Sequence, residues 1–520
     1  MNKFDLSYPL KSTYFCFFIL LILALFLWFI GLGNLPLRDW DEGYYGTVAK
    51  DMFKTENWLY LTYYGQPFLL KPPLIIWLIN LSYQLGGISE FTTRFPCALL
   101  TAFGVPLLYL VGKNIFSQQL PAILSSLVYL TLLPVIRHGR LGMIDGIINT
   151  FLIFSILCLV KSRKHPRWAI GYGIGLGLIA LSKGTLVIAL GAIIGVYILL
   201  DKPANYLKNP ALWLGICLGF MPVFIWYCIQ INHYGDIFIQ VHFLQQNFDR
   251  LATAVEGNSG SFWYYGLELI KYSFPWLLFL PGSLILAWRQ KQQSWAKLVL
   301  TGFCLFLAII TLMGTKLPWY IMPIYPFLAL GIGAYLSQFW QEHKSSPSGL
   351  IFGFFLASIA SLFGAIYLLI EGKEISLIIT GFIVFFTFLL SWQKIRKSFP
   401  DFVIILIIGL YMSLGIFMTS QSWIWELNEA FPVKPVATLI KQHTPANTII
   451  YTSFAYSRPS LDFYSDRQVL AQDQSALEKL ALSSSYLLLD QNSLKNLPLS
   501  NAKILGKAEG FILVSTSENH

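Results

Sequence analysis

Long apolar segments with almost no charged residues follow one another along the first 420 residues of the chain. The sequence is 56% hydrophobic and only 12% charged, whereas a soluble domain has about 25% charged residues. So few charges cannot cover the surface of a soluble protein of 520 residues. A soluble enzyme, a disordered chain and a disulfide-linked secreted scaffold are excluded, and a polytopic α-helical membrane protein is predicted.

Thirteen segments are long and apolar enough to be predicted as transmembrane helices. Two of them are separated only by Ser182 and Lys183, which leaves the count of spans open at that point. The predicted spans are residues 12–32, 94–113, 119–136, 144–160, 168–181, 184–200, 210–231, 269–288, 298–313, 317–338, 349–370, 375–391 and 402–419.

The distribution of Lys and Arg supports this arrangement. If the N-terminus is cytoplasmic and successive loops lie on alternate sides, most of the net charge of +10 falls on the cytoplasmic side. Cytoplasmic loops are the ones that retain an excess of basic residues. Topology therefore accounts for the charge, and no nucleic-acid partner is predicted. The C-terminus is then predicted to lie on the outer, periplasmic face of the plasma membrane.

Two segments are too polar or too short to be spans. Residues 33–93 are predicted as a long outer loop, in which residues 74–86 suit a helix that lies along the membrane interface. Residues 421–520 are more polar and are predicted as a small soluble α/β domain, following a transmembrane domain over residues 1–420. Its predicted strands are Thr448–Phe454, Arg467–Leu470, Ser485–Asp490 and Phe511–Ser515, and its predicted helices are Pro435–Gln442 and Ala476–Leu482.

The densest polar cluster lies in the first outer loop, which reads Arg-Asp-Trp-Asp-Glu-Gly-Tyr-Tyr over residues 38–45. Carboxylates beside a membrane are costly unless they are solvated, paired or used in chemistry. Asp41 is predicted to cap a helix that continues through Phe53. Composition alone leaves two interpretations open: a capping acid with charges at headgroup level, or a catalytic carboxylate.

Five basic residues are predicted on the outer face, against the topology rule. One precedes a pair of prolines, and the acid Asp145 lies close in sequence to two others. An anion bound on this face, such as a lipid-linked phosphate, would explain the set. Snorkelling or scattered surface bases are the alternative. The five residues are Lys71, Arg137, Arg140, Lys183 and Lys316.

Seven short motifs in one order resemble the GT-C class of membrane glycosyltransferases, and within it the bacterial aminoarabinose transferase and protein O-mannosyltransferase-like group. The resemblance covers nearly the whole chain, and it is the order of the motifs that makes it specific. The motifs are Asp41-Glu42-Gly43-Tyr44-Tyr45, Lys71-Pro72-Pro73-Leu74, Arg94-Phe95-Pro96, Arg140-Leu141-Gly142-Met143-Ile144-Asp145, Ser182-Lys183-Gly184, Phe262-Trp263-Tyr264-Tyr265 and Lys316-Leu317-Pro318-Trp319-Tyr320-Ile321-Met322-Pro323.

The resemblance implies a role for several of these residues. The catalytic carboxylate of the family's first loop falls on Asp41, its second outer-face acid on Asp145, and its donor-phosphate lysine on Lys71. Glu42 is expected to assist Asp41. Weaker substrate-binding candidates are Tyr44, Tyr45, Trp263 and Tyr320.

The sequence departs from the aminoarabinose transferases at positions that hold a metal there. An acid precedes the Lys-Pro-Pro in those proteins, but here the residue is Leu70, and no His lies shortly before Phe262. An Arg of those proteins is replaced here by Tyr44. His233 and His242 lack a third nearby ligand and are predicted to be solvated or hydrogen-bonded. A divalent metal cofactor is therefore left open.

These observations predict an inverting glycosyltransferase at the outer face of the plasma membrane. It would move a hexosyl or pentosyl group from a polyprenyl-phosphate-linked donor to a hydroxyl of lipid A, a protein or a cell-surface glycan. Asp41 would take the proton, and the five bases would stabilise the leaving phosphate. The alternative is a transporter of lipids or lipid-linked sugars, which would carry charges in mid-span and two repeated halves. The sugar, the acceptor, the oligomeric state and the role of residues 421–520 stay open.

Overall fold

The computed structural model describes residues 12–249, 253–254, 257–342, 346–427, 431–499 and 502–516. The chain divides into two compact units. We call Met1–Leu32, Leu69–Leu74 and Cys97–Trp423 the helical unit, and Gly33–Phe68, Ile75–Pro96 and Ile424–His520 the α/β unit. Residues 1–11, on which the prediction of a cytoplasmic N-terminus partly rests, lie outside the described residues.

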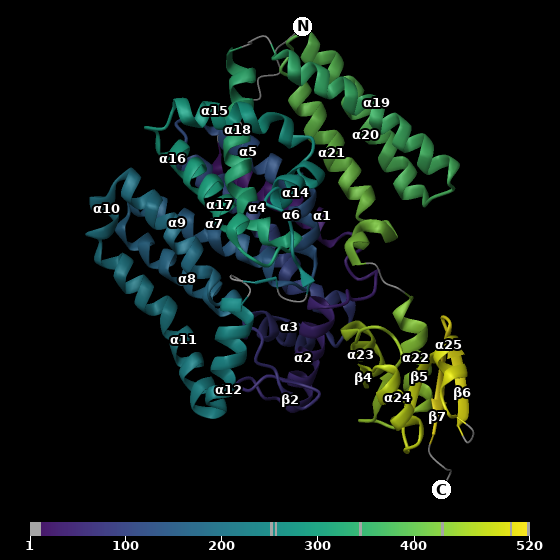
Figure 1. The fold of residues 1–520 in the computed structure, drawn as a ribbon. Coiled ribbons are helices and arrows are strands. Elements are labelled where there is room, and N and C mark those ends of the chain that lie inside the picture. The colour runs from purple at the N-terminus through teal and green to yellow at the C-terminus, as the bar shows by residue number, and fades with distance from the viewer. Residues whose placement is uncertain are drawn as a thin grey trace. The chain divides into compact units, whose positions relative to one another are not determined.

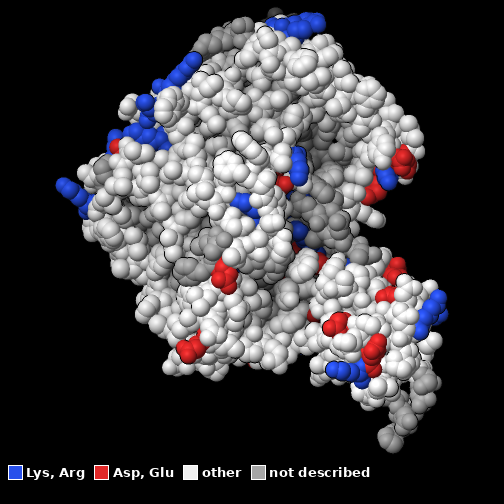
Figure 2. All heavy atoms as spheres, in the orientation of Figure 1, with Lys and Arg blue, Asp and Glu red and all other residues white. Residues whose placement is uncertain are grey.

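Helices account for nearly all regular structure of the helical unit, because an apolar backbone segment must satisfy its own hydrogen bonds (Figure 1). Charged side chains are sparse over this unit in the view of Figure 2, whereas both signs occur over the C-terminal residues. The α-helices are α1 (Thr13–Phe29), α4 (Glu90–Ile115), α5 (Gln119–Leu130), α6 (Leu133–Arg140), α7 (Ile144–Ser162), α8 (Ala169–Lys183), α9 (Leu186–Asp201), α10 (Pro203–Leu207), α11 (Pro210–Tyr234), α12 (Asp236–Phe238), α14 (Tyr264–Tyr272), α15 (Leu280–Arg289), α16 (Ser294–Leu300), α17 (Phe306–Leu312), α18 (Tyr325–Glu342), α19 (Ser348–Ile370), α20 (Ile375–Arg396) and α21 (Phe402–Phe417).

Several connections have a tighter or wider helical geometry. The π-helical segments are Ile239–Phe248 and Thr301–Leu305, and the 3₁₀ segments are Pro166–Trp168, Trp276–Phe279, Pro318–Ile324 and Gln421–Leu427.

Among the described residues, seven helices are long and apolar enough to cross a membrane, or up to nine if each of two bent pairs forms one span. The bent pairs are α5 with α6, at 59°, and α14 with Trp276–Arg289, at 114°. Further apolar helices, such as α1, α9 and α21, are shorter. These helices agree with the predicted polytopic membrane protein, while the count of thirteen spans stays a prediction.

Helices α8 and α11 pack with their backbones in contact through glycines spaced four residues apart. Gly173 and Gly177 of α8 meet Gly215 and Gly219 of α11, and a Cβ atom added to Gly177 would lie 2.0 Å from the carbonyl oxygen of Gly219. Small residues at this spacing allow two helices to approach closely within a membrane. Close packing against α11 therefore stabilises the short helix that was predicted as a span over residues 168–181.

We expect Gly177→Ala to destabilise the helical unit by about 1–3 kcal/mol, because the new methyl group must push α8 and α11 apart. The matched control is Gly191→Ala on α9, where no atom lies within 4 Å of the added Cβ. The control should be neutral or stabilising, since Ala favours a helix more than Gly does. Melting temperatures of the two detergent-purified variants test this, and equal shifts would contradict the close packing.

The α/β unit combines the first loop with the C-terminal residues. The loop contributes α2 (Asp41–Thr55), the antiparallel pair β1 (Thr62–Tyr63) and β2 (Gln66–Pro67), and α3 (Leu74–Gly86). Helix α3 coincides with the predicted interfacial helix over residues 74–86, whose position along the membrane surface stays a prediction. Helix α2 begins one residue earlier than predicted, because Trp40 is at the cap position that was predicted for Asp41, and Asp41 is the first helical residue.

The C-terminal residues form a five-stranded mixed sheet in the order β4-β3-β5-β7-β6, in which β3 runs parallel to β4 and β5 and the remaining pairs are antiparallel. Side chains of β5 alternate between two apolar clusters, with Leu488 packing against α22 and α23 and Leu487 and Leu489 packing on the face of α24. The predicted strands and helices coincide with β3 (Ile449–Thr452), β4 (Gln468–Ala471), β5 (Tyr486–Asp490), β7 (Phe511–Ser515), α22 (Val433–His443) and α24 (Gln474–Ala481), whereas α23 (Pro459–Ser465), α25 (Gln491–Asn496) and β6 (Lys503–Ala508) were not predicted.

Candidate active site

A cavity of 320 Å³ in the helical unit brings together several of the predicted site residues. Its polar lining includes Lys71, Asp145, Lys183 and Tyr320, which lie far apart in the sequence. Most of the remaining lining is apolar, and it comes from Ile148, Leu186, Ile188, Ala189, Ala192, Phe306, Ile309, Ile310, Met313 and Pro323. A ligand that joins an anionic group to a hydrocarbon chain would match both parts of this lining.

The end of α8 and the start of α7 supply an ion pair to this cavity. The Nζ of Lys183, the last residue of α8, lies 2.6 Å from Oδ1 of Asp145 and 4.5 Å from the ring centre of Tyr320. Asp145 lies in the first turn of α7, where the helix dipole stabilises a negative charge. Only 6% of Asp145 is exposed, so the lysine offsets a charge that burial would otherwise make costly.

Lys71 reaches the cavity from the short segment Leu69–Leu74, and its Nζ donates a hydrogen bond to Oε1 of Gln246 at 3.3 Å. The carbonyl oxygen of Leu69 accepts from Nδ1 of His242 at 2.8 Å. Nε2 of His242 therefore accepts from the hydroxyl of Tyr227, at 2.9 Å. Gln246 and Tyr227 were not singled out in the sequence, because neither belongs to a recognisable motif.

The prediction that His242 is a hydrogen-bonded histidine is confirmed by these two contacts. The ring is buried, and burial lowers the pKa of His242 to about 4, so it is neutral near pH 7. A neutral ring with both nitrogens bonded ties the segment that carries Lys71 to α11.

We expect the melting temperature to fall as the pH falls from 6.5 towards 4, because the unfolded His242 takes up a proton that the folded ring does not. His242→Phe should keep the stacking on Phe238, where the ring centres lie 4.9 Å apart, but lack this part of the pH dependence. Melting temperatures of both proteins at several pH values test this. Equal slopes in that range would show that His242 is already accessible to protons in the folded state.

Two of the other predicted basic residues donate hydrogen bonds to backbone carbonyl oxygens. Arg140 donates to the carbonyl oxygens of Leu27 and Ile30, both at 2.6 Å, where α1 ends, and lies over the ring of Trp423. Lys316 donates to the carbonyl oxygens of Ile310 and Thr311 at the end of α17. These contacts satisfy acceptors that a helix end leaves open. They favour a structural role for Arg140 and Lys316, and Arg137 is likewise buried.

In the α/β unit, the carboxylate of Asp41 is partly exposed at the first position of α2. It makes no hydrogen bond or ion pair with any residue in the described part of the chain. The preceding residue, Trp40, has a φ of 66°, which is unusual for a residue with a side chain, and 50% of it is exposed. A carboxylate with no partner among the described residues, next to a residue in a strained conformation, makes Asp41 a candidate for a reactive group.

Glu42 differs from Asp41 because it is completely buried and paired. Its two carboxylate oxygens accept from Nε and Nη2 of Arg94 at 2.9 and 2.8 Å, and Arg94 also donates to the carbonyls of Leu35 and Pro36. A bidentate pair of this kind fixes the geometry of the loop. The position favours a supporting role for Glu42 over direct contact with a substrate.

The aromatic candidates differ in exposure. Tyr45 is buried, whereas Tyr44 is partly exposed and its ring centre lies 5.0 Å from that of Tyr63. In the helical unit, Trp263 is 71% exposed just before α14, and Tyr320 contacts Lys183 as described above. Of the four, only Tyr320 lines the cavity.

The residues present do not fit a divalent metal. No group of three or more His, Cys, Asp or Glu side chains close enough to hold one occurs within the described ranges. His242 has both ring nitrogens bonded within the protein, and Leu70 stands where the related enzymes have an acid. We therefore derive no step through a metal.

The sequence is similar to a known protein family and to several known proteins. Residues 70–227 match the family described as dolichyl-phosphate-mannose-protein mannosyltransferase. An uncharacterized protein of Aquifex aeolicus is 25% identical over 458 residues, which cover 87% of each chain. The undecaprenyl phosphate-alpha-4-amino-4-deoxy-L-arabinose arabinosyl transferase of Aeromonas hydrophila is 26% identical over 330 residues. That match covers 62% of this chain and 60% of the relative's own length.

Solved structures show the same fold. The crystal structure of ArnT from Cupriavidus metallidurans bound to undecaprenyl phosphate superposes with a TM-score of 0.80 at 17% identity, covering 96% of this chain and 98% of that chain. The oligosaccharyltransferase AglB from Archaeoglobus fulgidus gives a TM-score of 0.53 at 11% identity, covering 94% and 70% of the two chains. The resemblance predicted from the motifs is therefore confirmed: the chain is similar, in sequence and in fold, to the GT-C membrane glycosyltransferases of the aminoarabinose transferase and protein mannosyltransferase type.

Proposed function

We propose that this chain is an inverting glycosyltransferase of the plasma membrane, which moves a sugar from a polyprenyl-phosphate donor to an acceptor hydroxyl. The observation that carries the proposal is the cavity in which Lys71, Lys183 and Asp145 join a predominantly apolar lining. A lipid phosphate has the same composition, because one anionic group is attached to a hydrocarbon chain. The similarity to a protein whose structure holds undecaprenyl phosphate supports this class of ligand.

The proposed reaction is a single displacement at the anomeric carbon of the sugar. The acceptor oxygen forms a bond to that carbon while the bond to the phosphate oxygen breaks, and the electron pair leaves with the lipid phosphate. Asp41 takes the proton of the acceptor hydroxyl, as a general base. This role is supported by a partly exposed carboxylate that no described residue binds.

The leaving phosphate gains negative charge as the bond breaks, and cations placed beside it lower the barrier. Lys71 and Lys183 are the two cations that line the cavity. Asp145 keeps the ammonium group of Lys183 in place, and Tyr320 covers it on another side. Arg137 stays a proposed phosphate-binding residue, while Arg140 and Lys316 are assigned to the backbone carbonyls that they contact.

We place the reaction on the outer face of the membrane, with the C-terminus on the same side. The proposed donor sugar is a hexose or a pentose, and the proposed acceptor is lipid A, a protein or a cell-surface glycan. Names of related proteins support an undecaprenyl or dolichyl phosphate donor.

Asp41→Asn should lower turnover by at least about a hundredfold, because general-base catalysis contributes about 10²–10⁴-fold. The protein is reconstituted in lipid nanodiscs with undecaprenyl phosphate-linked aminoarabinose or mannose and an envelope extract as the source of acceptor. Release of free undecaprenyl phosphate is measured. Glu56→Gln is the matched control, since Glu56 is an exposed carboxylate just after α2. Turnover of a folded Asp41→Asn protein near that of the control would overturn the assignment.

The double variant Asp145→Asn/Lys183→Met should weaken binding of undecaprenyl phosphate about tenfold, because a hydrogen bond to a charged group contributes about 1.5–3 kcal/mol. The change keeps the net charge of the cavity and avoids leaving Asp145 buried without its lysine. Binding is followed by the rise in melting temperature that added undecaprenyl phosphate causes, with undecaprenol as the ligand that lacks the phosphate. Lys208→Met, at an exposed position, is the control. Unchanged binding by the double variant would remove Lys183 from the phosphate site.

The alternative, a transporter of lipid-linked sugars, is separated by the products of the same reconstituted protein. A transferase releases undecaprenyl phosphate and forms a glycosylated acceptor, whereas a transporter moves the intact donor between leaflets of a vesicle. Movement of the donor without release of undecaprenyl phosphate would favour the transporter.

A further inference from the structure

The C-terminal residues contact the first loop on both sides of Asp41. On one side, Nε of Arg458 donates to Oδ2 of Asp39 at 2.7 Å, and the backbone N–H of Ser460 donates to Oδ1 at 3.3 Å. On the other side, Gly43 packs so closely on Pro459 and Ser460 that an added Cβ would lie 2.6 Å from the nitrogen of Ser460. Arg458 and the first turn of α23 therefore hold the residues that flank Asp41 at two points.

These contacts constrain how α2 begins. Trp40 has φ 66° and ψ −115°, a strained conformation that persists only where neighbouring contacts impose it. Asp39 before it is bound to Arg458, and the Trp40 ring stacks on Tyr456 with the ring centres 5.7 Å apart. Residues of the C-terminal segment therefore constrain the backbone of Asp41, although its carboxylate forms no hydrogen bond or ion pair with the described ones.

The ion pair between Arg458 and Asp39 is buried, with 1% and 3% of the two side chains exposed. Arg458 also donates to the carbonyl oxygen of Phe431 at 2.8 Å and lies 4.1 Å from the centre of its ring. Removing one member of a buried pair leaves the other charge without compensation and is strongly destabilising. Arg458 therefore anchors Asp39 to the core of the C-terminal sheet, to which Phe431 belongs.

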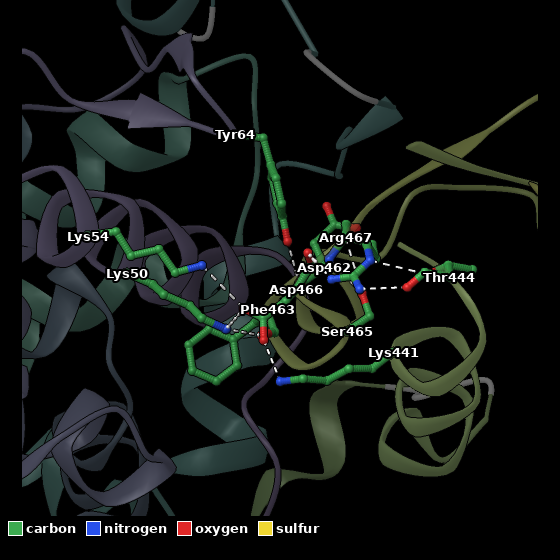
Figure 3. Close-up of polar contacts among 10 residues, drawn as sticks. All are labelled: Lys50, Lys54, Tyr64, Lys441, Thr444, Asp462, Phe463, Ser465, Asp466 and Arg467. Carbon is green, nitrogen blue, oxygen red and sulfur yellow. Dashed lines mark hydrogen bonds and ion pairs between the residues drawn. The ribbon is translucent and has the colours of Figure 1, made fainter. Parts of the chain in front are cut away.

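The C-terminal segment also contacts the rest of α2 (Figure 3). Lys50 donates to the carbonyl oxygen of Phe463 at 2.8 Å and pairs with Asp466 at 2.5 Å, and Lys54 and Lys441 reach the same carboxylate. Three lysines around Asp466 hold the pKa of its carboxyl well below the usual range. The hydroxyl of Tyr64 donates to the carbonyl oxygen of Asp462 at 2.6 Å, which adds the turn between β1 and β2 to the contact.

We propose that the C-terminal α/β segment is the element that positions the catalytic carboxylate, and that Arg458 acts as a positioning residue for Asp41 through Asp39 and Trp40. The inference rests on the proposed function, because it assumes that Asp41 is the base. It assigns to residues 431–516 a part in the chemical step, in place of a role in stability alone. A carboxylate displaced by about 1 Å loses about a hundredfold in rate, so the anchoring is worth a measurable factor.

The test compares kcat, the KM for the lipid donor and the melting temperature of three variants, in the nanodisc assay with undecaprenyl phosphate-linked aminoarabinose or mannose. Arg458→Met should lower kcat at least about tenfold and leave the KM for the donor within about twofold, since the donor phosphate is assigned to other residues. Arg458→Lys, which keeps the charge, should restore part of the lost kcat. Tyr456→Ala, which removes the stack on Trp40 and an edge contact with Phe454 but leaves the buried ion pair in place, covers the case in which Arg458→Met does not fold.

Asp473→Ala is the matched control for lost stability of the same segment. The Asp473 side chain caps α24, on the other face of the sheet, by accepting from the backbone N–H of Ala476 at 2.8 Å. Loss of a cap destabilises a helix, so this variant should melt earlier than the wild type with an unchanged kcat. If it loses as much kcat as the Arg458 and Tyr456 variants at a similar melting temperature, Arg458 is only structural and the inference fails.

The two proposals fail in different ways. If Asp41→Asn is inactive while Arg458→Met and Tyr456→Ala keep the wild-type kcat, the inference is overturned and the proposed function stands. If Asp41→Asn is as active as the wild type, Asp41 is not the base, and the inference falls with that assignment. A rise in the KM for the donor with unchanged kcat in the Arg458 variants would also overturn positioning, because it would place Arg458 in donor binding.

Discussion

A charge that leaves water must find a partner, and in a chain with so few charges this constraint determines what each charged residue does. Three examples among the described buried charges show this. Arg140 and Lys316 compensate carbonyl oxygens at helix ends, and Glu42 and Asp39 are each bound to an arginine of the α/β unit. Lys183 and Asp145 also pair, but they do so on the wall of a cavity, where a ligand can reach them. A charged pair on a cavity wall can take part in chemistry, whereas the other buried charges serve the structure.

Much of the fold could be predicted from the sequence because its signals are local. Continuous apolar runs predicted the helices, a 13-residue run between polar segments predicted α3, and short apolar runs within a polar segment predicted strands such as β7. The signals failed where packing at a distance decides the structure. Helix α23 is only seven residues long, and its contacts include α2 and β1, which are hundreds of residues away in the sequence. The sequence around residues 459–465 contains no pattern that predicts contact with the first loop.

The sequence motifs also identified some, but not all, of the residues that the candidate site involves. The motifs identified Lys71, Asp145, Lys183 and Tyr320, and the structure places all four on one cavity. They also identified Arg140 and Lys316, because a base next to a span looks the same in sequence whether it binds a phosphate or a carbonyl oxygen. Arg458 was missed for the opposite reason, since a single arginine in a polar segment is ordinary until its partner, Asp39, is known. Counting charges in the sequence identifies candidates, and the fold then shows which of them line a cavity and which contact backbone carbonyl oxygens.

The central claim is that the cavity of the helical unit holds the phosphate of a lipid donor with its hydrocarbon chain along α9 and α17. Photocrosslinking with a polyprenyl phosphate that carries a diazirine near the phosphate tests this most directly. The account predicts labelled peptides within Thr185–Ala192 and Phe306–Met313, with labelling suppressed by excess undecaprenyl phosphate and not by undecaprenol. Labelling confined to other helices, such as α19 and α20, or competed equally by undecaprenol, would contradict it.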